Sequence, residues 1–173
     1  FLLNDLGSFF TPLLYALRER ERILDVFEAV TGSRMMCNYF RFGGVKRDLD
    51  EDSLAAIKTI VRKFPRFLDE FETLLTSNEI LCMRCQNVGV LPADLAVNAG
   101  ITGPTLRASG VNYDIRKIDR YGLYDRFDFK VPLGKKGDVY DRYYIRILEM
   151  RESVKILEQA LQALPAGDFI HPK

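Results

Sequence analysis

The chain has 173 residues, of which 47% are apolar and 28% charged, and its formal net charge is +1. This length suffices for one domain with a core, and a balanced charge without a basic stripe speaks against nucleic acids or acidic substrates as partners. Three cysteines do not resemble a secreted disulfide framework, which favours a reducing compartment. No apolar run reaches the roughly 18 residues needed to span a bilayer. Because both ends fall abruptly at apolar or helix-ending stretches, we interpret residues 1–173 as a single helical domain from the middle of a longer polypeptide.

The first half of the chain is predicted to form long helices. Thr11 and Pro12 mark a helix start, with Thr11 as the N-cap and Pro12 in the first turn. Apolar residues then recur at helical spacing up to Gly32, which suits the end of a helix. The run "RERER" at 18–22 is expected to be a solvated helix face with modest ion pairs.

A second long helix is expected over about 52–75, and shorter ones follow it. Ser53 is a candidate N-cap of this helix, and Pro65 in its interior predicts either a kink or two abutting helices. Short helices are expected over 78–83 and 92–99.

The second half combines irregular backbone with one clear helix. From residue 103 the helical period is lost, and "RFDFKVPL" at 126–133 alternates like a strand that ends in a hairpin turn, "GKKGD". Residues 138–164 restore the helical period until Pro165. The expected fold class is therefore mainly α, a bundle of long helices with a small β hairpin insertion.

The sequence gives little support for a metal site, a redox cysteine pair or a catalytic triad that contains histidine. Cys82 and Cys85 form a CxxC, but a structural zinc needs four ligands, and the chain adds only Cys37 and the single histidine, His171. We therefore expect no metal site and interpret Cys82 and Cys85 as small apolar residues. His171 lies in the tail, which is a poor place for a general base.

Two charged features leave alternatives open. "TGPTLRASGVNYDIRK" holds Arg107, Asp114, Arg116 and Lys117 in glycine-rich backbone. Such residues either tie a loop by Arg–Asp pairing or line an interface or site. Asp5, among the apolar neighbours of "FLLNDLGSFF", is either a helix cap or a buried carboxylate able to hold a proton.

Several motifs, in order and at near-constant spacing, carry a resemblance to a known family. They include "NDLG", "RERE", "FEAVTGSRMM", "NYFRFGGV", "LRASGVNYDIRK" and "GDVYDRYYIR". From residue 5 to residue 167 the chain resembles the D subunit of proton-pumping NADH:quinone oxidoreductase, respiratory complex I, whose counterpart in photosynthetic NDH complexes is the H subunit. The resemblance implies the fold of a [NiFe]-hydrogenase large subunit without its nickel cysteines. Cys82 and Cys85 do not match those ligands, whereas Arg84 between them matches a family arginine.

The resemblance also implies roles for individual residues. Arg41, in the Gly-Gly segment, would take part in a buried polar contact at the junction with the neighbouring iron–sulfur subunit. Arg34 and Met36 would lie near that subunit's terminal [4Fe–4S] cluster. Many members carry a titrating His at the position of Met36, so its replacement by Met predicts a weaker pH dependence of the cluster potential. Asp5 would supply or relay protons at the quinone site, next to a family His and Tyr that lie upstream of Phe1.

The function implied by the resemblance is that of part of a multisubunit translocase. The chain would contribute to the quinone-reduction cavity and couple electron transfer to proton translocation. Candidates for the cavity or interface networks would be Arg41, Arg107, Asp114 and Arg116.

The chain would belong to the peripheral arm of a membrane-bound complex, on the cytoplasmic face of a bacterial plasma membrane or on the equivalent stromal or matrix face. The sequence does not indicate whether the electron donor is NADH or ferredoxin. The fragment alone is expected to bind no cofactor, to be inactive and to be capable of non-native dimerisation. A related ferredoxin- or hydrogenase-type complex and a non-catalytic interaction module are the alternatives.

Overall fold

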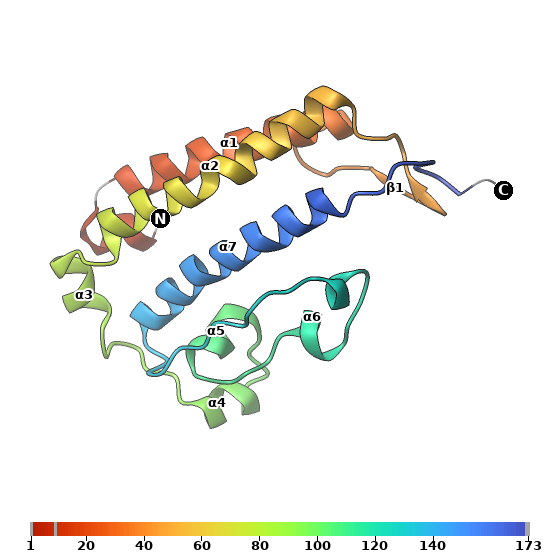
Figure 1. Cartoon of the computed structure of the whole chain (residues 1–173). Helices are drawn as coiled ribbons and strands as arrows, with labels where there is room; N and C mark the ends of the chain where they lie inside the picture. Colours follow the sequence, from red (N-terminus) through yellow and green to blue (C-terminus); the bar gives the residue numbers. More distant parts are fainter. Residues whose placement is uncertain (1, 9, 172–173) are drawn as a thin grey trace.

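Three long helices form the body of the computed structural model, which describes residues 2–8 and 10–171. They are α1 (Thr11–Thr31), α2 (Glu51–Leu75) and α7 (Val139–Gln162). Figure 1 shows α1 and α2 side by side in opposite directions, with α7 below them and a layer of short elements below α7. The mainly α class is confirmed, and the likeness to the hydrogenase fold stays a prediction.

The short elements lie at the ends of the long helices. The chain begins with η1 (Asn4–Ser8), and α3 (Glu79–Cys85) follows α2. The lower layer holds α4 (Ala93–Asn98), α5 (Gly103–Ala108), α6 (Ile115–Ile118) and η2 (Tyr124–Arg126). The expectation of unbroken irregular backbone after residue 103 was therefore wrong, because α5 and α6 are short helices.

The helix caps differ from those predicted. Thr11 is already helical and follows Phe10, which makes no side-chain cap hydrogen bond. The carboxylate of Asp50, not Ser53, caps α2 by accepting the Ser53 N–H at 2.8 Å. α2 runs through Pro65 as one helix. Asp138 caps α7 by accepting the Asp141 N–H at 2.8 Å, and it is 1% exposed.

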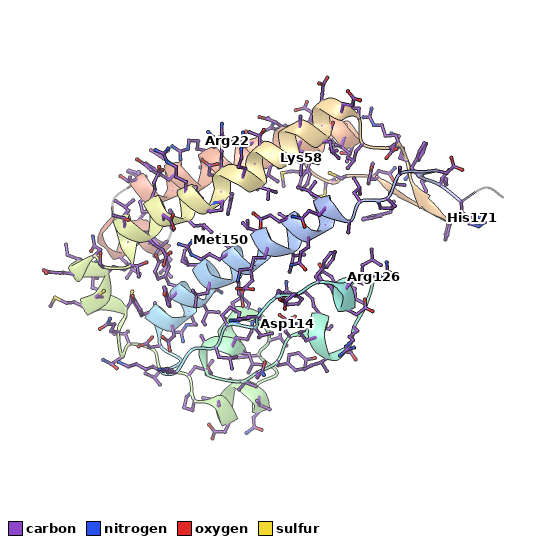
Figure 2. The ribbon with its side chains drawn as sticks, in the orientation of Figure 1. Arg22, Lys58, Asp114, Arg126, Met150 and His171 are labelled. Carbon is purple, nitrogen blue, oxygen red and sulfur yellow. The ribbon has the colours of Figure 1, made fainter. Side chains whose placement is uncertain are left out.

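The apolar core lies where α2, α3 and α7 meet. It joins the last turns of α2 to one side of α3 and to the first half of α7: Phe67, Leu68, Phe71, Leu75, Leu81, Cys85 and Ile147. Figure 2 places Met150 on the side of α7 that faces α2, and this residue packs against the same core. The core therefore fixes the lower end of the three-helix body, from which the lower layer starts.

The predicted strand over 126–133 is wrong, and its backbone shows why. Asp128 donates its N–H to Gln159 Oε1 at 2.8 Å, and Gln159 Nε2 donates to the Asp128 carbonyl at 2.8 Å. The Lys130 N–H reaches Glu152 Oε2 at 2.9 Å. The segment is extended, with Phe129 buried inward at 4% exposure, but side chains of α7 take the place of a partner strand.

The β hairpin lies elsewhere, at the Gly-Gly segment. β1 (Phe40–Arg41) pairs antiparallel with β2 (Gly44–Val45), and Gly43 turns the chain with φ +84°. A left-handed φ of this size favours glycine. The hairpin projects beyond the ends of the long helices, beside the C-terminal end of the chain (Figure 1).

The C-terminal tail pairs with β2, and this pairing accounts for glycine at position 44. Val45 donates its N–H to the Phe169 carbonyl at 3.0 Å, the His171 N–H reaches the Gly43 carbonyl at 2.9 Å, and Gly44 bridges to Ile170. A Cβ on Gly44 would stand 2.2 Å from the Phe169 oxygen and 2.8 Å from the Ile170 Cα. Gly44 is therefore required by close backbone approach.

Gly44→Ala is expected to release the tail from β2, because the new methyl group collides with backbone that cannot rotate away. Two backbone hydrogen bonds would be lost, at about 1 kcal/mol each, and the amides of Val45 and His171 should exchange with deuterium much faster. Gly32→Ala is the matched control, since φ at Gly32 is +80° but nothing lies within 4 Å of its added Cβ. That variant should lower the free energy of unfolding by about 1 kcal/mol with unchanged protection at residues 45 and 171. Unchanged exchange in Gly44→Ala would contradict the assignment.

Candidate functional site

A buried network of two cations and two anions joins the lower layer to α7. Arg107 of α5 donates from Nε to Glu149 Oε1 of α7 at 2.5 Å and from Nη1 to the Tyr113 carbonyl at 3.0 Å. Its Nη1 also lies 3.8 Å from Asp114 Oδ2. Arg107 is 7% and Asp114 3% exposed, so this is an internal network. Figure 2 shows Asp114 directly below α7.

Asp114 is the acceptor at the centre of this network. Arg116 donates from Nε to Oδ1 at 2.9 Å and from Nη2 to Oδ2 at 2.6 Å, and its backbone N–H reaches Oδ1 at 3.0 Å. Burial acts to raise the pKa of Asp114, but the hydrogen bonds from Arg116, helped by the charge of Arg107, outweigh it and hold this pKa below its usual range. Asp114 is therefore an anion at neutral pH and not a proton donor.

Both basic side chains of α6 also lie against a buried ring. The Arg116 guanidinium carbon is 4.8 Å and the Lys117 Nζ 4.1 Å from the centroid of Phe129. Cation–π contacts of this kind fasten α6 to the extended segment. Of the two interpretations left open for this stretch, the geometry matches the loop tied by Arg–Asp pairing, and its role in an interface stays a prediction.

Arg41 lies apart from that network, on the hairpin. It is exposed, and its Nη1 donates to Asn38 Oδ1 at 2.9 Å and to the Phe40 carbonyl at 2.7 Å. In the chain by itself Arg41 is thus not in the buried polar contact that the resemblance implied. Its guanidinium instead covers a backbone carbonyl of β1, a position that discourages unwanted strand pairing.

Arg34 is held by three carboxylates of one face of α1. Its Nη1 donates to Asp25 at 2.7 Å and to Glu28 at 3.4 Å, and its Nη2 contacts Glu21. The Asp25 hydrogen bond is the largest cause of a raised Arg34 pKa. This clamp fixes the chain where it leaves α1, two residues before Met36, which is 90% exposed with φ +56°. A left-handed backbone is rare for a residue other than glycine and marks a constrained turn.

The charged face of α1 is also less uniform than expected. Glu19 is 5% exposed, accepting Arg18 Nε at 2.8 Å and Arg22 Nη1 at 2.6 Å. The expectation of a wholly solvated face is therefore wrong at Glu19, which the two arginines cover.

Asp5 is exposed, so the buried-carboxylate interpretation is wrong for the chain by itself. It lies in the first turn of η1, where its carbonyl accepts Arg84 Nη1 at 3.3 Å. Its neighbours Leu3 and Leu6 pack against the core. Among the described side chains, Asn4 Oδ1 is buried without a hydrogen-bond partner. The surroundings of Asp5 therefore combine an exposed acid with a buried acceptor that lacks a donor.

Two tyrosines of α7 close the junction between α2 and α3. Tyr140 donates its hydroxyl to the Thr76 carbonyl at 3.0 Å, and the Tyr143 hydroxyl lies 3.0 Å from Thr76 Oγ1. Burial raises the pKa of Tyr143 to about 12, so it stays neutral at physiological pH. Cys82 is half-buried here, and Cys85 is 1% exposed within the core, as expected for a small apolar residue.

Metal-binding and membrane-spanning features are not found in the described part of the chain. Within residues 2–8 and 10–171, no three or more His, Cys, Asp or Glu side chains gather to hold a metal ion. None of the helices there combines the length and apolar character of a membrane span. An apolar hollow of about 420 Å³ lies between α1, α2 and α7. Its described lining residues include no ionisable side chain, so it offers no acid–base chemistry.

Sequence reasoning missed the partners that lie far away in the chain. Glu149 was not singled out, because nothing near it in the sequence indicates that it pairs with Arg107, 42 residues away. Gly44 could be recognised as a turn residue, but the tail that passes over it comes from the other end of the chain. The acids that hold Arg34 could have been found from their spacing, since Glu21, Asp25 and Glu28 share one helix face.

The comparisons with known proteins agree with one another. The family model described as "Respiratory-chain NADH dehydrogenase, 49 Kd subunit" matches residues 5–173. The chain is 57% identical over 175 residues to the second of the D subunits of NADH-quinone oxidoreductase from Herpetosiphon aurantiacus, covering 100% of the chain and 47% of that protein. It is 55% identical to the first of the D subunits from Roseiflexus sp., covering 99% and 46%. With NADH-quinone oxidoreductase subunit 4 of Thermus thermophilus it shares 51% identity, covering 98% and 41%. The chain thus spans about half the length of these curated relatives.

Asp114→Asn is expected to lower the free energy of unfolding by about 2–4 kcal/mol at pH 7, because the half-buried Arg116 loses its counter-ion and the buried Arg107 loses a nearby negative charge. The folded-state pKa of Asp114 is lowered, so its stabilising contribution is complete above the usual carboxyl range and disappears as pH falls through the folded-state pKa. Urea unfolding at neutral pH and in steps below about pH 4 should show the gap between wild type and variant closing in acid. The exposed Asp119→Asn should stay within about 0.5 kcal/mol of wild type. A pH-independent gap would contradict this account.

Proposed function

Because the chain belongs to the family of the 49 kDa subunit of respiratory-chain NADH dehydrogenase, we propose that it is part of the D subunit of an NADH:quinone oxidoreductase. It contributes to the cavity in which quinone is reduced and to the interface with the subunit that carries the terminal iron–sulfur cluster. The relatives are named as NADH-quinone oxidoreductase subunits, which favours this complex over a ferredoxin- or hydrogenase-type complex. In this proposal the chain lies in the peripheral arm of a membrane-bound translocase.

The main support for the proposed interface is the exposure of apolar side chains in the segment after α1. Met36, Phe40 and Phe42 are 90%, 85% and 106% exposed. A clamped turn and a paired hairpin hold these apolar side chains out in the solvent, which costs free energy unless another surface covers them. Apolar side chains on a rigid projection are typical of a surface that docks against another protein.

The proposed role of Asp5 also requires that neighbouring polypeptides cover the surface around it. Its carboxylate is exposed in the chain, and the buried Asn4 acceptor beside it lacks a donor among the described side chains. An unsatisfied buried acceptor costs about 1–3 kcal/mol, which a donor from a neighbouring subunit would recover. Once covered, the carboxylate could hold a proton and deliver it when quinone is reduced. This role would couple electron transfer to proton movement.

Asp5→Asn in the assembled complex is expected to lower quinone reduction by about tenfold to a hundredfold, because the amide cannot donate an acidic proton. Reduction of the iron–sulfur clusters by NADH should be unchanged, since it does not need that proton. The readouts are steady-state quinone reductase activity and the cluster signals after NADH addition. Asp168→Asn, at another exposed acid, is the control and should keep wild-type rates. A wild-type rate in Asp5→Asn would refute the role.

Met36→His is expected to make the midpoint potential of the terminal cluster more dependent on pH. A histidine near the cluster would take up a proton on reduction, so the potential should fall as pH rises through about 6.5, the ordinary pKa of histidine. Redox titrations of the intact complex between about pH 5 and about pH 8 measure the slope. Met83→His, at an exposed position on α3, should leave the slope as in wild type. A steep slope already present in the wild type would contradict the proposal.

A further inference from the structure

The π-helical turn η1, which carries Asp5, is held in place by its neighbours. Figure 1 shows the start of the chain next to α3, at the end of the molecule where α1 begins and α2 ends. A π-helical turn is rare, and five residues are too few to form a stable helix by themselves. Leu3 and Leu6 fasten the turn by packing against the apolar core. The orientation of Asp5 therefore depends on the contacts that η1 makes with other elements.

Two residues of α3, one helical turn apart, contact η1. Ile80 packs against Gly7, because a Cβ on Gly7 would stand 2.7 Å from Ile80 Cγ2. The φ of Gly7 is +117°, a conformation that favours glycine. Arg84 lies four residues further along the same face of α3 and donates from Nη1 to the Asp5 carbonyl at 3.3 Å. α3 thus contacts η1 both at Asp5 and just after it.

The contact with Asp5 is the distinguishing feature of the Arg84 side chain. Within residues 2–8 and 10–171, the Asp5 carbonyl is the only hydrogen-bond acceptor found for the Arg84 guanidinium, which makes no ion pair with a described carboxylate. The two residues are 79 positions apart in the sequence. The contact therefore fixes the placement of η1 relative to α3, and it does not serve a local turn or a surface ion pair.

We propose that Arg84 is a positioning residue for Asp5. It holds the backbone of Asp5 against α3, so that the carboxyl group keeps a fixed distance and direction to the quinone oxygen that it protonates. This inference rests on the proposed function, which assigns proton delivery to Asp5 and names no residue that orients it. Proton transfer requires a donor within about 2.6–3.2 Å of the acceptor. A small displacement of η1 therefore slows the reaction without weakening the binding of quinone.

Steady-state kinetics of the assembled complex test this role. Arg84→Met keeps an unbranched apolar stem but removes the donor, and it should lower kcat for quinone reduction by about threefold to tenfold with an unchanged KM for quinone. Arg84→Lys should keep most of the wild-type kcat, because the contact uses a single N–H, which an ammonium can also donate. Reduction of the iron–sulfur clusters by NADH should be unchanged in both variants. Arg62→Met, at another exposed arginine, is the control and should keep the wild-type kcat.

A double-mutant cycle with Asp5→Asn separates positioning from a general structural effect. If Arg84 acts through Asp5, Arg84→Met should lower kcat no further in a complex that already carries Asp5→Asn. A comparable further loss in that background would overturn the inference. So would a wild-type kcat in Arg84→Met, a raised KM with unchanged kcat, or an Arg84→Lys variant as slow as Arg84→Met. A wild-type kcat in Asp5→Asn would instead refute the proposed function, and the inference with it.

Discussion

The ion pair between Arg107 and Glu149 is the contact on which the lower half of the molecule depends. It joins a short helix of the lower layer to the middle of α7 at 2.5 Å, and Asp114 and Arg116 complete the charge balance around it. Removing one member of such a buried set leaves an uncompensated charge, which is far more destabilising than the loss of an exposed pair. Buried apolar side chains such as Leu106 and Phe129 also contribute to this layer, and the polar contacts to α7 add a directional link to their packing.

α7 serves two different neighbours with its two sides. Towards α2 it presents apolar side chains and Arg151, which reaches Asp69 at 2.7 Å. Towards the lower layer it presents acceptors for backbone groups, with Glu152 binding the Lys130 N–H. Burial acts to raise the pKa of Glu152, but this hydrogen bond and Lys155 outweigh it and lower the pKa. α7 therefore packs against the apolar core on one side and, on the other, supplies hydrogen-bond acceptors to the extended segment 126–133, which has no partner strand.

The sequence could predict the long helices because their signal is local. Helical spacing, Pro12 and Gly32 located α1, and the helices predicted over 78–83 and 138–164 are found as α3 and α7. The prediction of a strand over 126–133 was wrong because the alternation of apolar and polar residues indicates which side chains point inward. It does not indicate which groups accept the backbone hydrogen bonds. The Gly-Gly hairpin was missed as a β element because each strand has only two residues and one of its neighbours is the tail.

The candidate site was predictable only where its members lie close in sequence. Asp114 and Arg116 are two residues apart, and their pairing was one of the two interpretations of that stretch. Glu149 and the acids that hold Arg34 come from other elements, so only the folded chain brings them together. Asp5 and Arg41 are exposed in the chain by itself, and the burial expected for them presupposes the neighbouring polypeptides of the proposed function. Charged residues on a projecting segment and in an apolar stretch cannot by themselves reveal which surface covers them.

The pairing of the tail with β2 has a consequence for the order of events during synthesis. The hairpin leaves the ribosome before α7, whereas residues 169–171 emerge only after α7 has been made. Until then the edge of β2 stays open, and the nascent hairpin carries exposed phenylalanines next to unpaired backbone, a combination prone to aggregation. The three-stranded pairing is therefore completed only after α7 has been made, although the hairpin is translated well before α7, which leaves a defined interval in which a chaperone could protect it.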